Sequence, residues 1–180
     1  MRVKHCLQFL AFLAFCSSTA PLQAATDGSL GASSTGDTDI SLTVPDLVKF
    51  GGISDLAFGS YTGTGNISQD DDVCVWTNVT TADYVVTASG SGTASAFTLT
   101  DGSETIAYQV FWNDVAGTSG SVELSTGVAS ATQTGANTTA LDCSGGVNAN
   151  FQVTMSQSVL LAVAPNSYAG VLTLTIEPAP

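Results

Sequence analysis

Apolar and polar residues alternate with a period of two along most of this chain. The clearest run lies at residues 147–155, where every second residue is apolar: Val147, Ala149, Phe151, Val153 and Met155. This alternation is typical of a strand with one buried face. Shorter runs of the same kind occur at 40–44, 47–50, 53–61, 73–79, 84–88, 97–100, 105–112, 122–124 and 168–177. Some are broken by Pro or Gly, and together they predict about eight short strands.

The segments between these runs are rich in turn-forming residues. Asp101-Gly102 is a strong hairpin signal between two alternating runs. Residues 126–140 are rich in Ser, Thr, Ala and Gly and predict a long surface loop. Only residues 158–164 favour a helical turn. The chain is therefore expected to be all-β, with an immunoglobulin-like antiparallel β-sandwich as its architecture.

The first 24 residues have the pattern of a secretion signal. Arg2, Lys4 and His5 precede an apolar run from Cys6 to Cys16, which is too short to span a bilayer. Small residues follow up to Ala24, where cleavage is expected. We therefore predict a signal peptide at 1–24, a flexible polar leader at 25–38 and a β-sandwich domain at 39–180.

Removal of the signal leaves two cysteines, Cys74 and Cys143. Export carries the protein to a compartment where disulfides form, so these two residues are expected to be bonded to each other. The bond would link two strands that are far apart in the sequence. A bridge closing a loop of this length stabilises a fold by about 4 kcal/mol in chain-entropy models.

The strongly negative charge of the chain excludes some classes of binding partner. Loss of Arg2 and Lys4 with the signal changes the formal net charge from −12 to −14 and leaves Lys49 as the single basic residue against fifteen acids. Nucleic acid is excluded as a partner, because phosphate binding needs clustered Lys and Arg. An anionic membrane surface is disfavoured for the same reason, and no membrane insertion is expected.

The mature chain has few of the residue types that catalyse reactions. The single histidine, His5, belongs to the signal, and the mature chain has no arginine. Ser-His-Asp and Cys-His catalysis and zinc sites built from His or Cys are therefore excluded. A hydrolase using two carboxylates is the remaining enzyme class. We expect no enzyme and no cofactor.

An acidic run is the one candidate for a metal site. Asp70, Asp71 and Asp72 carry the oxygen ligands that Ca²⁺ prefers. The alternative is a solvated acidic surface loop without a ligand.

Three stretches together resemble the subunits of bacterial chaperone–usher pili. They are Asp39-Ile40-Ser41-Leu42-Thr43-Val44, Asp55-Leu56-Ala57-Phe58-Gly59-Ser60-Tyr61, and Tyr168-Ala169-Gly170-Val171-Leu172-Thr173-Leu174-Thr175-Ile176. The second and third are similar to motifs of the spore coat protein U group, which builds archaic pili.

The resemblance implies an incomplete sandwich that is completed by a donated strand. Residues Gly170, Leu172, Leu174 and Ile176 would lie on the strand that borders an open groove. Ile40, Leu42 and Val44 would form the donor strand of a neighbouring subunit. The implied partners are a periplasmic chaperone, an outer-membrane usher and identical or related subunits, and the implied location is the periplasm and then a surface fibre serving adhesion or biofilm formation.

A second interpretation remains open. Ile40, Leu42 and Val44 equally fit the first strand of a complete sandwich, and the leader at 25–38 lacks the apolar alternation of a long donor extension. The alternative function is therefore a self-contained secreted or periplasmic module that binds Ca²⁺ or carbohydrate and does not polymerise.

Overall fold

The computed structural model describes residues 25–179, and the predicted signal peptide lies outside this range. The chain divides between Val44 and Pro45 into two units. In the first unit, residues 25–44 are exposed, and Thr26 and Asp37 exchange two backbone hydrogen bonds of 3.0 Å. The second unit, which begins at Pro45, holds the sandwich.

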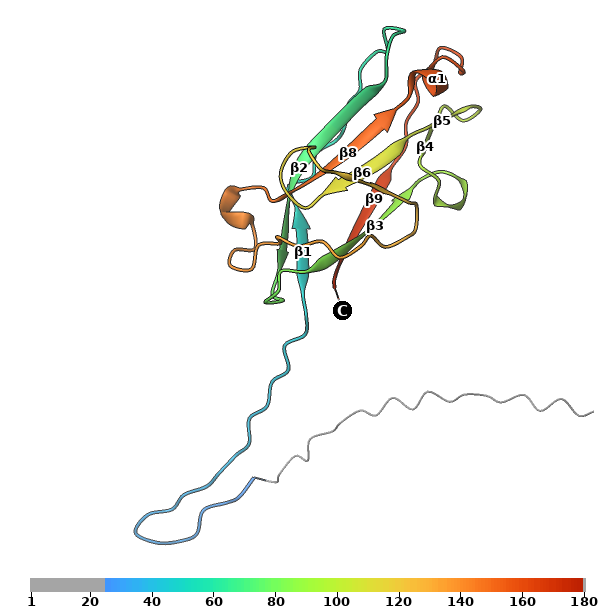
Figure 1. The fold of residues 1–180 in the computed structure, drawn as a ribbon. Helices are drawn as coiled ribbons and strands as arrows, with labels where there is room; N and C mark the ends of the chain where they lie inside the picture. The colour runs from blue at the N-terminus through green and yellow to red at the C-terminus, as the bar shows by residue number, and fades with distance from the viewer. Residues whose placement is uncertain (1–24, 180) are drawn as a thin grey trace, which may run out of the picture. The chain divides into compact units, whose positions relative to one another are not determined.

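One layer of the sandwich is a five-stranded antiparallel sheet in the order β1-β2-β8-β6-β7 (Figure 1). Its strands are β1 (Val48–Gly51), β2 (Ile67–Thr77), β8 (Ala149–Met155), β6 (Gln109–Asn113) and β7 (Val122–Leu124). The run predicted at 147–155 forms β8, whose odd-numbered residues are all buried. Period-two alternation places these side chains on the inner face of the sheet.

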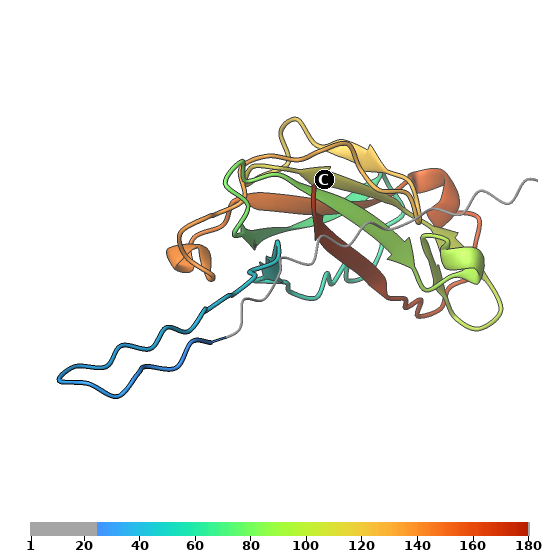
Figure 2. The same ribbon diagram turned by 90° about the horizontal axis from the view of Figure 1, so that it is seen from below.

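The other layer is the antiparallel pair of β3 (Tyr84–Gly90) and β9 (Leu172–Pro178), which lie side by side in Figure 2. A short hairpin of β4 (Thr98–Thr100) and β5 (Thr105–Ala107) follows β3, with the predicted Asp101-Gly102 turn between its strands. Among residues 25–179, helical structure is limited to η1 (Thr93–Ser95), η2 (Cys143–Gly145) and α1 (Gln157–Leu160). The predicted all-β antiparallel sandwich is confirmed.

The core fills the space between the two layers. Trp112 is 1% exposed and lies edge-on to Tyr84, with ring centroids 6.2 Å apart. Its indole Nε1 donates to the Tyr84 hydroxyl over 3.3 Å. Around this pair lie the buried side chains Val73, Val75, Val86, Val110, Phe151, Val153 and Ile176. Edge-to-face aromatic packing of this kind stabilises a core beyond the area it buries.

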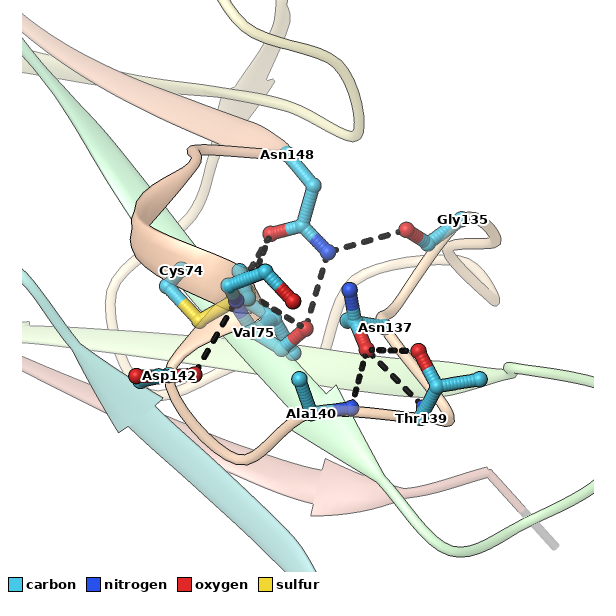
Figure 3. The surroundings of a disulfide bond; sticks show 10 residues. Cys74, Val75, Gly135, Asn137, Thr139, Ala140, Asp142 and Asn148 are labelled. Carbon is cyan, nitrogen blue, oxygen red and sulfur yellow. Dashed lines mark hydrogen bonds between the residues drawn. A yellow bond between two sulfur atoms is a disulfide. The ribbon is translucent and has the colours of Figure 1, made fainter.

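The predicted disulfide between Cys74 and Cys143 is present, with a Cα–Cα distance of 5.9 Å (Figure 3). Cys74 lies on β2, but Cys143 lies in the η2 turn rather than on a second strand. Asn148 supports this turn, since its amide accepts from the Val75 N–H over 2.8 Å and donates to the Val75 carbonyl over 2.8 Å. The bond therefore joins a strand to the connection that leads into β8.

Two predicted strands do not form ladders in the structure. Residues 40–44 and 53–61 are extended but belong to no strand among residues 25–179. The predicted strand at 105–112 is split at Tyr108, because β5 pairs with β4 whereas β6 pairs with β8. Alternation records which face is buried and not which neighbour supplies the hydrogen bonds, so it could not reveal these differences.

The segment predicted as a surface loop at 126–140 pairs with the outer edge of β3. Gly127, Ser130 and Gln133 each donate a backbone N–H over 2.8 Å to a carbonyl of β3. Small polar residues carry no alternating signal, so this edge cover was not predictable from the pattern. The acidic run Asp70–Asp72 was also expected in a loop, but it lies within β2.

Candidate functional site

The most unusual feature of the sandwich is the open edge of β9. One edge of this strand pairs with β3 over the full register from Tyr84–Pro178 to Gly90–Leu172. No other strand of residues 25–179 pairs with its second edge. A strand with a free edge presents a row of unpaired N–H and C=O groups that another strand can match.

Strand order shows what is missing from this edge. A seven-stranded immunoglobulin-type sandwich has four strands, A, B, E and D, in one sheet and three, C, F and G, in the other. Here β1, β2, β8 and β6 match the four-stranded sheet, and β3 and β9 match strands C and F. The position beside β9 that strand G would fill is vacant among the described residues.

An apolar hollow of about 350 Å³ lies along the free edge of β9. Leu172 and Leu174 of β9 form one side, and Ile53 and Leu56 form the other. Three core side chains also line it: Phe151 and Val153 from β8, and Tyr108 from the position just before β6. The hollow therefore reaches the core, although these three side chains are only 4–7% exposed.

A second hollow of about 820 Å³ continues the first toward α1. The two share Leu56, Phe58, Leu99 and Gly170 as lining residues. Together they form one elongated depression between residues 53–61 and 168–174, which we call the β9 groove.

The rim opposite β9 also has free backbone groups. Residues 53–61 take part in no backbone–backbone hydrogen bond within the part of the chain that the structure describes. Leu56 and Phe58 pack against the core, and the Ser54 N–H donates to the Asp71 carboxylate over 2.6 Å. A strand lying in the groove could therefore pair with β9 and also with this rim.

Of the four residues predicted on the strand that borders the groove, Gly170, Leu172 and Leu174 line it, whereas Ile176 lines neither hollow. Leu172 and Leu174 are half-buried, whereas Ile176 is buried against the core. Gly170 precedes β9 and lines both hollows. A Cβ atom at Gly170 would lie 2.8 Å from the Thr98 carbonyl oxygen, so this close approach requires glycine.

The residues predicted as a donor strand are exposed. Ile40, Leu42 and Val44 have exposed fractions of 92%, 87% and 65%, and none belongs to a strand. Single exposed apolar residues are common, but three at alternate positions of an extended segment form a continuous apolar face. This face has the pattern that an apolar groove would accept.

The other sheet edges are short or covered. Residues 127–133 cover the outer edge of β3. The five-stranded sheet ends in β1 and β7, which have four and three residues, and β1 carries the charged Lys49. Short strands and edge charges discourage pairing between chains. The seven-residue β9 is therefore the edge best suited to accept a strand.

The acidic run does not gather into a single cation site. Asp70 and Asp72 accept from the Asn150 Nδ2 over 2.9 and 2.8 Å, while Asp71 contacts the Ser54 N–H. Alternation along β2 separates Asp71 from the other two carboxylates. Within residues 25–179, no three His, Cys, Asp or Glu side chains form a group able to hold a metal ion.

Some groove residues were not predicted as such from the sequence. Phe151 and Val153 were expected on the buried face of a strand, and together with Tyr108 they also line the groove. Leu56 and Phe58 belong to a stretch that carried the pilin resemblance, but alternation alone assigned them to a strand. The signal that could have identified this rim is the absence of a clear pairing partner for the segment at 53–61.

No known family matches the chain, and no curated protein matches it. A solved structure of a chaperone–tip adhesin complex of CFA/I fimbriae is similar, with a TM-score of 0.49 and 16% sequence identity over 74% of this chain. The matching region spans 42% of the chain in that structure. Among the described residues, no helix has the length and apolarity needed to cross a membrane.

Proposed function

We propose that this protein is a structural subunit of an extracellular fibre, assembled by insertion of residues 39–44 of one copy into the β9 groove of the next. The observation that carries the proposal is the free edge of β9 beside an apolar groove that reaches the core. The role is structural rather than catalytic.

Physical complementarity supports this pairing of segment and groove. Six extended residues, 39–44, span about 20 Å, close to the roughly 23 Å of the seven residues of β9. Main-chain hydrogen bonds to β9 would supply affinity, and alternate side chains would enter the groove. Full burial of an Ile, Leu or Val side chain contributes about 1.5–3 kcal/mol each. The exposed face of Ile40, Leu42 and Val44 can therefore account for strong binding.

The same groove defines the proposed partners. Before assembly, a periplasmic chaperone would fill the groove with a strand of its own, and an outer-membrane usher would then pass the subunit to the fibre. These two partners follow from the resemblance to spore coat protein U-like pilus subunits. The proposed route runs from export into the periplasm to the cell surface, where the fibre would support adhesion or biofilm formation.

A peptide-binding experiment tests the proposal. A mature chain lacking residues 39–44 is mixed with a synthetic peptide of residues 38–45, and thermal unfolding is measured. Binding to the folded state alone raises the melting temperature, by an amount that grows with the logarithm of the peptide concentration divided by its Kd. We expect a clear rise with this peptide and none with a matched peptide in which Ile40, Leu42 and Val44 are Ser.

Two outcomes would count against the proposal. An equal effect of both peptides would mean that the apolar face is not recognised. No effect of either peptide on a folded deletion chain would mean that the groove does not accept this segment.

A further inference from the structure

Asn150, on β8, combines complete burial with an unpaired oxygen. The residue is 0% exposed. In the part of the chain that the structure describes, its Oδ1 is the one buried side-chain nitrogen or oxygen without a hydrogen-bond partner. Buried polar atoms almost always have a partner, so an exception calls for an explanation. A cation is one explanation, because amide oxygens are ligands of Ca²⁺.

The other end of the same amide faces two carboxylates. The Asn150 Nδ2 donates to the Asp70 Oδ2 over 2.9 Å and to the Asp72 Oδ1 over 2.8 Å. Two oxygens of separate carboxylates thus converge on one point. Ca²⁺ takes its oxygen ligands at about 2.3–2.6 Å, so a small inward movement would let both carboxylates bind the same ion.

Strand register brings these three side chains together and keeps the third aspartate apart. Asp72 lies directly opposite Asn150 in the antiparallel pair of β2 and β8, and Asp70 lies two residues before it on the same face. Asp71 lies opposite Phe151, which is buried in the core. The cluster therefore lies on the outer face of the sheet, whereas Asp71 points to the inner face.

The connection from β6 to β7 lies against this outer face. The Gly117 N–H donates to the Asp72 Oδ1 over 2.7 Å, and the Asn113 Nδ2 donates to the Ser119 carbonyl over 3.0 Å. Asp70 and Asp72 themselves are exposed. The cluster thus has a buried amide at its inner end and carboxylates at its outer end, where water can complete the coordination of an ion.

We propose that Asp70, Asp72 and Asn150 bind a calcium ion on the outer face of the five-stranded sheet. This set differs from the acidic run in the sequence, because the Asn150 amide takes the place of Asp71. The inference goes beyond the proposed function and does not depend on it.

A half-turn of the Asn150 amide would give its unpaired oxygen a partner. The rotation exchanges the two ends of the amide, so that Oδ1 faces the ion and Nδ2 leaves the carboxylates. Asn113 lies directly opposite Asn150 in the pair of β6 and β8, at a typical Cβ–Cβ separation of about 4.5–5.5 Å. The Asn113 side chain uses its Nδ2 for the Ser119 carbonyl, so its Oδ1 could accept from the rotated Asn150 Nδ2.

The ligand set favours calcium over magnesium. Ca²⁺ accepts six to eight oxygens in irregular geometry, including bidentate carboxylates and water, whereas Mg²⁺ requires a near-ideal octahedron and loses its water reluctantly. Two carboxylates and one amide supply few ligand charges. We therefore expect a Kd of about 10⁻⁴–10⁻³ M, as in extracellular calcium-binding modules.

Calorimetric titration with calcium chloride tests the site on the full mature chain after treatment with a chelator. Asp70→Asn and Asp71→Asn are the matched pair, because each removes one negative charge from adjacent positions and keeps an oxygen acceptor. Asp70→Asn should weaken calcium binding about tenfold or more, since affinity depends on the charge of the ligands. Asp71→Asn should stay within about threefold of the parent, as expected for a charge outside the site.

Asn150→Asp tests the amide position in the opposite direction. A third carboxylate beside Asp70 and Asp72 should lower the melting temperature in the absence of calcium, because like charges repel in a buried place. A calcium ion would neutralise this repulsion. The rise in melting temperature on adding calcium chloride should therefore be larger for Asn150→Asp than for the parent chain.

Three results would overturn the proposal. The first is a parent chain that neither binds calcium in the titration nor gains melting temperature. The second is equal weakening by Asp70→Asn and Asp71→Asn, which would indicate diffuse attraction of cations to an acidic surface. The third is an Asn150→Asp chain whose stability does not respond to calcium. None of these results bears on strand exchange through the β9 groove, so the proposed function is tested separately.

Discussion

At the scale of single residues, burial explains the properties of Tyr84. Tyr84 is 1% exposed, and burial raises the pKa of its hydroxyl from the ordinary 10.0 to about 12, with a smaller contribution from nearby Asp114. The neutral phenol suits its position, because it accepts from Trp112 and avoids placing a charge in the core.

The raised pKa of Tyr84 predicts a loss of stability in alkali. The stabilising contribution is complete below pH 10, where both folded and unfolded tyrosine are neutral, and it falls as the pH rises from 10 through 12. Denaturant unfolding at pH 9, 10, 11 and 12 measures this decline.

Tyr84→Phe is the matched control for the alkaline decline. It should cost about 1 kcal/mol at neutral pH through the lost Trp112 hydrogen bond, and its stability should decline less between pH 10 and 12. An equal decline in both proteins would assign the alkaline effect to other groups.

Residue identity predicted some of these roles and not others. The disulfide was predictable because Cys74 and Cys143 remain alone after the signal is removed. The hydrogen bonds of the Asn78 amide were not predictable, because its partners Pro45 and Leu47 lie more than 30 positions earlier. A polar residue at the end of a strand has no pattern that identifies its hydrogen-bond partners.

At the scale of secondary structure elements, β9 and the rim at 53–61 are both extended and show similar alternation, but they differ in backbone pairing. β9 has one paired edge, and the rim has none among the described residues. Alternation predicted the buried faces of both, since that depends on side chains. It could not predict pairing, since every strand carries the same backbone groups.

The two faces of β9 supply a charge-matched pair of variants. Leu174 points into the groove, while Thr173 is exposed on the other face. Leu174→Asp should weaken binding of the peptide of residues 38–45 roughly a hundredfold, because a leucine contact is lost and a carboxylate is desolvated. Thr173→Asp adds the same charge and should leave the affinity within about threefold of the parent.

Isothermal titration of the chain lacking residues 39–44 measures both affinities. Equal weakening by the two variants would point to a general charge effect. Unchanged binding in both would show that the peptide does not contact the apolar face of β9.

At the scale of the whole molecule, charge opposes the association that the groove favours. The mature chain is expected to carry fifteen acids and one lysine, so approaching copies repel each other. Screening shortens this repulsion from about 30 Å at 0.01 M salt to about 8 Å at 0.15 M. The fold class could be predicted from composition and alternation. The unfilled position beside β9 could not, because recognising it requires the order of the strands in the sheets.

Assembly of the mature chain should therefore be several-fold faster at 0.15 M than at 0.01 M sodium chloride. The rate of ladder growth after refolding measures this directly, with melting temperature at each salt concentration as the control for stability. Slower assembly at higher salt would indicate attraction between charged groups of opposite sign at the interface, contrary to this account.

The most direct test of the central claim is gel electrophoresis of the protein taken from the surface of its own host. Samples of the wild type and of a chain lacking residues 39–44 are run with and without boiling. Strand exchange through the β9 groove predicts a ladder of multiples in the unheated wild type that collapses on boiling and is absent from the deletion. A single monomer band in every lane would contradict it and favour a self-contained secreted sandwich.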